Sequence, residues 1–90
     1  MTPSWRVEFD PDAARDLRKL GHDARSIILR YLRERIATTD NPRRFGRALT
    51  GDLKGLWRYR VGDYRIVAAI EDDHFIVLIV TVGHRREVYD

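Results

Sequence analysis

The amino-terminal half of the chain has the hydrophobic spacing of one short strand and two helices. Residues 5–9 alternate between apolar and polar side chains, as a strand with one buried face does. Asp10 is a helix-capping residue followed by proline, and it predicts a helix over residues 11–20 that Gly21 ends. Apolar residues recur at helical spacing over residues 24–38 and predict a second helix. Two antiparallel helices joined by a tight turn are therefore expected.

The carboxyl-terminal half changes to a hydrophobic period of two, which is typical of strands. It is preceded by a loop rich in glycine and arginine over residues 41–55, which Phe45, Leu49 and Leu53 are expected to anchor to the core. The predicted strands cover residues 56–61, 64–70 and 75–82, and two-residue hairpin turns join them at Gly62-Asp63 and Asp72-Asp73.

These elements predict a single α+β domain over residues 1–90, with the order β-α-α-β-β-β. The helical hairpin is expected to pack on one face of an antiparallel sheet. A chain of 90 residues with 43% hydrophobic and 34% charged side chains fits one small globular domain. Because it contains no cysteine, disulfide scaffolds, cysteine zinc sites and thiol catalysis are excluded.

Hydropathy gives no indication of a membrane segment. The longest apolar run, residues 75–82, is shorter than the roughly 20 residues that a transmembrane helix needs. Acidic residues at positions 8, 10 and 12 occupy the place where a signal peptide requires an apolar stretch. We therefore expect a cytoplasmic protein without a membrane partner.

The positive charge is concentrated in the middle of the chain. The formal net charge is +3, but residues 41–70 hold seven basic and only two acidic side chains. Arginine is the basic residue best suited to forked contacts with phosphate, and it supplies 15 of the 17 basic residues. A base-composition bias in the genome would produce the same preference, so the charge indicates a polyanionic partner without establishing one.

The register of the first predicted hairpin places arginines together on one face of the sheet. A two-residue turn at positions 62–63 sets Arg60 directly opposite Arg65, with Arg58 two residues along on the same face. Like charges in this arrangement destabilise a sheet by on the order of several tenths of a kcal/mol. Either the face is solvated or neutralised by nearby aspartates, or the cluster binds an anion.

The last predicted strand continues into a segment, residues 83–89, that carries further polar side chains. We expect it to bring an imidazole, two guanidiniums and a phenol to the arginine cluster. Arginines can hold phosphate oxygens and stabilise the charge of a phosphoryl-transfer transition state. His84 is the best local proton-transfer group, and Tyr89 is the preferred base-stacking residue. The histidines do not have metal-ligand spacing and the glycines match no nucleotide-binding motif, so neither a metal nor a cofactor is expected.

Three segments resemble the RelE/ParE superfamily of toxins from bacterial and archaeal type II toxin–antitoxin modules, most closely its RelE branch. They are residues 9–20, 49–67 and 82–89. The resemblance implies a RelE-like fold and a metal-independent endoribonuclease that cuts mRNA in the ribosomal A site, where the RNA 2′-hydroxyl attacks the adjacent phosphate. It also implies three partners: a cognate RelB-like antitoxin, the 30S subunit with its 16S rRNA, and mRNA.

The resemblance assigns roles to individual residues. Arg58 and Arg60 correspond to a pair of basic strand residues that are usually lysine, so the general base remains unassigned. His84 stands where some relatives have lysine. The candidate catalytic residues are Arg58, Arg60, Arg65, His84, Arg85 and Tyr89, and the candidate RNA- or phosphate-binding residues are Lys54, Arg47 and Arg86.

Two other functions remain open. One is a ParE-like gyrase inhibitor that has the same fold and no nuclease activity. The other is a catalytically silent module that binds RNA or an antitoxin. The convergence of arginines, a histidine and a tyrosine favours the nuclease, because a protein without chemistry has less need for that combination.

Overall fold

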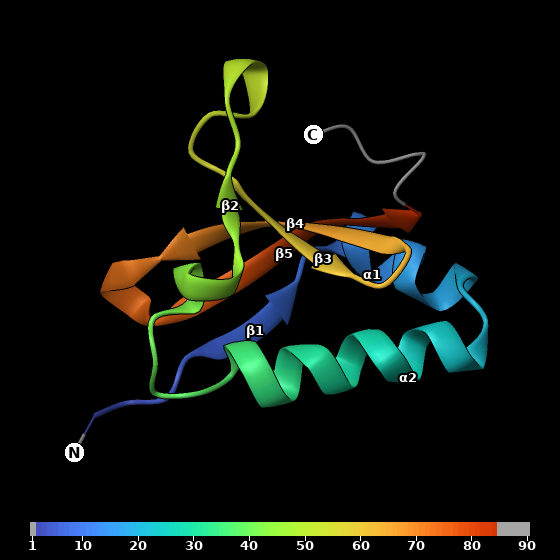
Figure 1. The fold of residues 1–90 in the computed structure, drawn as a ribbon, viewed down its shortest axis with the longest axis horizontal. Coiled ribbons are helices and arrows are strands. Elements are labelled where there is room, and N and C mark those ends of the chain that lie inside the picture. The colour runs from blue at the N-terminus through green and yellow to red at the C-terminus, as the bar shows by residue number, and fades with distance from the viewer. Residues whose placement is uncertain (1, 85–90) are drawn as a thin grey trace.

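Two helices cover one face of a five-stranded sheet in the computed structural model, which describes residues 2–84 (Figure 1). The strand order is β1-β5-β4-β3-β2. β1 is parallel to β5, and all other neighbouring strands are antiparallel. The predicted α+β class is confirmed, with one short strand more than the sequence pattern indicates.

The elements follow the predicted order with small shifts at their ends. They are β1 (Arg6–Phe9), α1 (Pro11–Lys19), α2 (His22–Tyr31), β2 (Arg47–Ala48), β3 (Trp57–Val61), β4 (Tyr64–Glu71) and β5 (Ile76–His84). A π-helical turn over Leu32–Ile36 extends α2. Among the described residues no helix is both long and apolar enough to cross a membrane.

The first helix begins as the sequence predicts. The Asp10 carboxylate accepts a hydrogen bond of 2.8 Å from the backbone N–H of Ala13, and Pro11 occupies the first helical position. The helix ends at Lys19, so the stop comes before Gly21. This glycine has an extended conformation and caps the start of α2 instead of terminating α1 in a left-handed conformation.

The predicted loop over residues 41–55 contains short regular pieces. Two 3₁₀ turns, Pro42–Phe45 and Gly51–Leu53, flank the two-residue strand β2, which pairs with β3. β2 is too short to show alternation in the sequence. Figure 1 shows that β2 and the turn after it project from the body of the sheet.

The connection between β4 and β5 differs from the predicted two-residue turn. Glu71 pairs with Ile76, so four residues lie between the strands. Asp72–His74 form a 3₁₀ turn, and Phe75 follows with a left-handed φ of 54°. The expectation of a two-residue hairpin turn at Asp72-Asp73 is therefore wrong. The chain reverses over four residues instead, with the 3₁₀ turn and the left-handed Phe75 between the two strands.

A β-bulge in β5 changes which of its side chains face the helices. Val67 pairs with Thr81 but Ala68 pairs with Ile79, so Val80 is an extra residue. Strict alternation from Ile79 would turn residue 81 toward the helices. The bulge turns Val82 inward instead, where it joins the main core.

The main core lies between the helices and the sheet, as the hairpin register predicts. Its buried members include residues of both layers: Ala13, Ile28, Leu32, Ile36, Tyr59, Val61, Ile66, Ala68, Val77, Ile79 and Val82. Leu49 and Val67 form a second cluster, to which Leu53 contributes. Phe45, predicted as an anchor, belongs to neither cluster and stays 39% exposed.

Candidate phosphate-binding site

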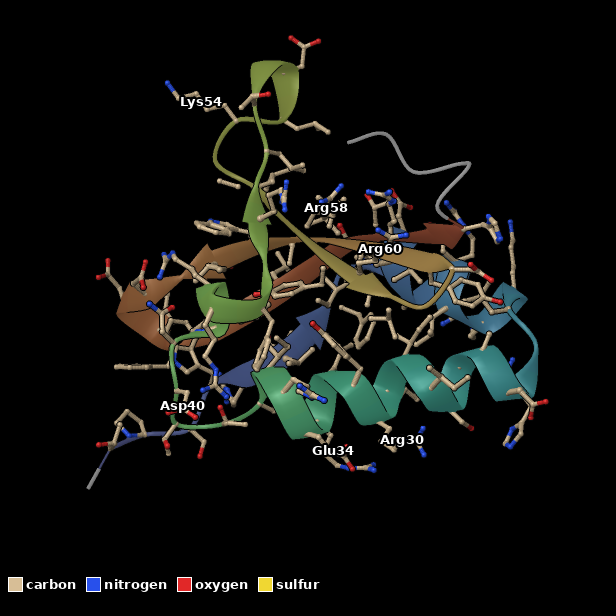
Figure 2. All side chains as sticks on the ribbon, in the orientation of Figure 1. Arg30, Glu34, Asp40, Lys54, Arg58 and Arg60 are labelled. Carbon is tan, nitrogen blue, oxygen red and sulfur yellow. The ribbon has the colours of Figure 1, made fainter. Side chains whose placement is uncertain are left out.

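The arginine face of the sheet has the register predicted from the sequence. Arg60 lies opposite Arg65, and Arg58 lies opposite Val67. Figure 2 shows Arg58 and Arg60 on the side of the sheet that faces away from α2. The core residues of β3 and β4 occupy the other face, so the fold separates the positive charges from the hydrophobic core.

The short strand β2 adds a fourth arginine to this face. Arg47 lies directly opposite Arg58 across the β2–β3 pair, and residues opposite each other share one face. Arg47 is one of the phosphate-binding residues expected from the sequence, but β2, the strand that positions it, has no visible pattern there. Arg47, Arg58, Arg60 and Arg65 are called the arginine face below.

A hollow of about 250 Å³ opens beside the arginine face. Its lining residues are Arg44, Phe45, Gly46, Arg47, Arg58 and Arg60. The 3₁₀ turn Pro42–Phe45 and β2 form one wall, and β3 forms the other. A guanidinium-lined hollow of this kind suits a phosphate group, since several forked donors can converge on its oxygens.

Gly46 allows the wall of the hollow to lie close to β3. A Cβ at this position would lie 3.1 Å from Cε1 of Tyr59 and 3.4 Å from the backbone oxygen of Arg58. Any larger residue would push the segment that carries Arg44 and Arg47 away from the sheet.

Two polar contacts hold the same segment in place. The guanidinium of Arg43 makes two hydrogen bonds to the Asp72 carboxylate, at 3.0 and 2.6 Å, and lies 5.6 Å from the Trp57 ring centroid. The buried Tyr59 hydroxyl donates a hydrogen bond of 2.7 Å to the carbonyl of Pro42. These contacts tie residues 42–46 both to β3 and to the β4–β5 connection.

The contacts also shift two acid–base equilibria. The hydrogen bond from Arg43 lowers the pKa of the Asp72 carboxyl below its ordinary value. Burial raises the pKa of Tyr59, so its hydroxyl stays protonated and remains a donor. Neither group titrates near neutral pH. The two contacts that hold residues 42–46, called the clamp below, therefore do not change with pH in that range.

The positive charges of the face are only partly compensated. Within residues 2–84, Arg47 and Arg60 make no ion pair with an acidic side chain, and both are exposed. The Nε atoms of Arg58 and Arg65 are buried at the sheet surface. The suggested neutralisation by nearby aspartates therefore does not extend to Arg47 and Arg60, and these two are available to an anionic ligand.

The structure does not bring every candidate residue to this face. Lys54 lies at the far end of the projecting segment, away from Arg58 and Arg60 (Figure 2). Three other predicted site residues, Arg85, Arg86 and Tyr89, lie outside the described residues.

His84 lies on the opposite side of the sheet from the arginines. It pairs with Tyr64, and the two rings meet edge-on with centroids 5.9 Å apart. Since Gly83 is the residue opposite Arg65, His84 shares the helix-facing side. No pattern in the sequence indicates the bulge at Val80 that sets this orientation. The role of His84 in proton transfer stays a prediction. Its position on the helix-facing side argues against direct contact with a phosphate on the arginine face.

Within residues 2–84, no group of three or more histidine, aspartate or glutamate side chains could hold a metal ion. Among the side chains that line the hollow, arginine stays protonated and cannot serve as a general base. The described part of the site can thus bind and stabilise negative charge, while it supplies no proton acceptor of its own.

Comparison with known proteins gives consistent matches. Residues 7–89 match the family described as "ParE toxin of type II toxin-antitoxin system, parDE". Two curated proteins of Mycobacterium tuberculosis each align with 94% of the chain: "Toxin RelE" at 35% identity over 86% of its length, and "Toxin RelG" at 32% identity over 95% of its length. The fold is similar to a chain in the crystal structure of the toxin–antitoxin complex RelBE2 from the same organism. The TM-score is 0.85 and the identity is 30%, covering 97% of this chain and 98% of that one.

Proposed function

The chain belongs to the RelE/ParE superfamily of toxins from type II toxin–antitoxin modules, and we propose on that premise that it is a ribosome-dependent endoribonuclease. In this proposal it enters the ribosomal A site on the 30S subunit, contacts 16S rRNA, cuts mRNA there and so inhibits translation. The observation that carries the proposal is the arginine face with its adjoining hollow.

The arginine face supports phosphoryl-transfer chemistry. In the proposed reaction, the 2′-oxygen of one nucleotide bonds to the neighbouring phosphorus while the bond to the next 5′-oxygen breaks. The 2′-hydroxyl loses a proton and the leaving 5′-oxygen gains one, which yields a cyclic phosphate and a 5′-hydroxyl. Negative charge grows on the phosphate oxygens, where Arg58, Arg60 and Arg65 would stabilise it.

A RelB-like antitoxin is the proposed cognate partner. The similar M. tuberculosis chain comes from a toxin–antitoxin complex. An antitoxin segment rich in acidic residues would complement the exposed charges of Arg47 and Arg60 and would keep RNA away from them. RNA and antitoxin would then compete for the same face of the toxin.

The test is a reconstituted translation system programmed with a defined mRNA. We expect cuts within codons, and Arg60→Ala or Arg65→Ala should lower cleavage by about 100-fold, as the loss of a transition-state donor does. Arg30→Ala is the matched control, because this exposed arginine points away from the sheet on α2 (Figure 2) and should leave cleavage unchanged.

The same assay separates the rival functions. Intact message and continued translation would overturn the nuclease proposal. DNA breaks and a DNA-damage response in cells, with mRNA left whole, would instead indicate a ParE-like gyrase inhibitor. Measured in parallel, His84→Gln shows whether this side chain takes part in proton transfer despite its position on the other face.

A further inference from the structure

Phe45 is an exposed aromatic residue in the wall of the arginine-lined hollow. Its side chain is 39% exposed and belongs to neither hydrophobic cluster. A single exposed apolar residue is ordinary on a protein surface. What distinguishes Phe45 is its place in the lining of the hollow together with four arginines.

Two guanidiniums hold the Phe45 ring in position. Arg44 lies with its guanidinium carbon 4.6 Å from the ring centroid, and Arg35 lies at 5.3 Å. Arg35 belongs to the π-helical turn after α2, and Arg44 also pairs with Asp40 at 3.2 Å. The ring thus makes cation–π contacts with one guanidinium from the end of α2 and one from the wall of the hollow.

An aromatic ring beside several phosphate donors has the combination that single-stranded RNA requires. Bases stack on exposed aromatic side chains, while the backbone follows the positive charges. The hollow, at about 250 Å³, lies below the roughly 300–1,000 Å³ of pockets for drug-sized ligands. This size suits a single base with its phosphate.

We propose that the hollow is a nucleotide subsite, in which Phe45 stacks one base of single-stranded RNA and Arg47, Arg58 and Arg60 hold the neighbouring phosphate. The proposal rests on the proposed function and names a further contact of the same site. Because every base has a π-face, Phe45 contributes affinity with little sequence preference. Sequence reasoning preferred Tyr89 for stacking, and Phe45 is a separate platform.

The test measures binding of the full chain to a short 2′-O-methyl RNA that carries 2-aminopurine, in the absence of ribosomes. Phe45→Ala should weaken binding by about ten-fold, because it removes the ring on which the base stacks. Phe45→Trp should retain the affinity, and Phe45→Leu should behave like the alanine variant because it keeps apolar area without a π-face. An oligonucleotide that lacks the base at the position where Phe45 stacks should bind the wild type and the three Phe45 variants with equal affinity.

Three outcomes would overturn the subsite. One is equal affinity of wild type and Phe45→Ala for the base-containing RNA. Another is an equal loss for the abasic RNA, which would indicate a general loss of structure. The third is a loss of affinity for the antitoxin alone, which would make Phe45 a protein contact. Thermal unfolding of each variant verifies that the exposed substitution leaves the fold intact.

Failure of the proposed function is distinguishable from failure of the subsite. The RNA cannot be cleaved in the binding assay, because its 2′-oxygens are methylated. Base-dependent binding together with intact mRNA in the translation assay would sink the nuclease proposal and keep the subsite. Codon-internal cleavage together with no effect of Phe45→Ala on RNA binding would overturn the subsite and support the nuclease proposal.

Discussion

Arg60 and Arg65 face each other across β3 and β4, where a folding-optimised sheet would place a neutral or opposite-charge pair. The structure therefore combines a local cost in stability with a surface that suits an anion. When a side chain serves binding at the expense of folding, replacing it with a neutral residue should raise stability and weaken binding.

We expect Arg60→Gln to stabilise the protein while it weakens function. Removing the like-charge pair should raise the free energy of unfolding by on the order of several tenths of a kcal/mol, and RNA cleavage should fall. Urea denaturation at low salt measures the first effect. Arg30→Gln, on the outer side of α2, is the control and should change neither quantity. A destabilised Arg60→Gln protein would contradict this expectation.

Gly46 is the residue whose substitution should disturb both stability and the hollow. We expect Gly46→Ala to lower the free energy of unfolding by about 1–3 kcal/mol, because its Cβ would meet Tyr59 at 3.1 Å. The same variant should bind RNA more weakly. Denaturation midpoints and RNA titrations measure the two effects.

Gly21→Ala is the matched control for this substitution. A Cβ at Gly21 meets nothing within 4 Å, and its φ of −66° is open to alanine. Its stability should stay within about 1 kcal/mol of the wild type. An equal loss in both variants would show that the close approach at Gly46 is unimportant.

The regular elements were largely predictable, and their connections were not. Asp10 and Pro11 predicted the start of α1, and the turn at residues 62–63 predicted the register of β3 and β4. β2 and the bulge at Val80 escaped prediction because each depends on pairing with a neighbouring strand and leaves no periodic signal. The predicted strand over residues 75–82 stopped short of His84, and the face that His84 occupies follows from the bulge, so it could not be predicted.

The clamp between the Pro42–Phe45 turn and the β4–β5 connection should give stability a specific pH dependence. Asp72 has a lowered pKa in the folded state because of the hydrogen bond from Arg43. Its contribution is therefore complete above the unfolded pKa near 3.9 and is lost as the pH falls through the lower folded value. We expect Asp72→Asn to be less stable than the wild type at pH 7, with a difference that shrinks toward pH 2.

Thermal unfolding between pH 2 and pH 7 measures this difference. Asp73→Asn is the control, since Asp73 is exposed and forms no ion pair within residues 2–84. It should track the wild type at each pH. A constant difference between Asp72→Asn and wild type across the range would mean that the charge of Asp72 does not hold the segment.

The two faces of the sheet differ in what they carry. One face of the sheet carries the helices and the main core, and the other carries the arginine face and the hollow. The main core is thus kept apart from the concentrated positive charge, and only the small cluster around Val67 shares the arginine side of the sheet.

Binding of single-stranded RNA should consequently depend steeply on salt. Each phosphate neutralised contributes about 0.7 to the slope of log affinity against log salt concentration. Arg60→Gln should lower that slope by about 0.7, whereas Phe45→Ala should weaken binding and leave the slope unchanged. Titrations at several salt concentrations separate the two. Equal slopes for wild type and Arg60→Gln would remove Arg60 from the phosphate site.

The position of β5 has a consequence for the order in which the protein is made. β5 lies between β1 and β4 in the sheet, yet it follows every other strand that the structure describes in the order of synthesis. The amino-terminal strand therefore waits for a partner more than sixty residues later in the chain, and it can pair only after β5 has left the ribosome. The β4 side of the arginine face gains its full support only after β5 has emerged, so a nascent chain that has not yet exposed β5 lacks the finished binding surface.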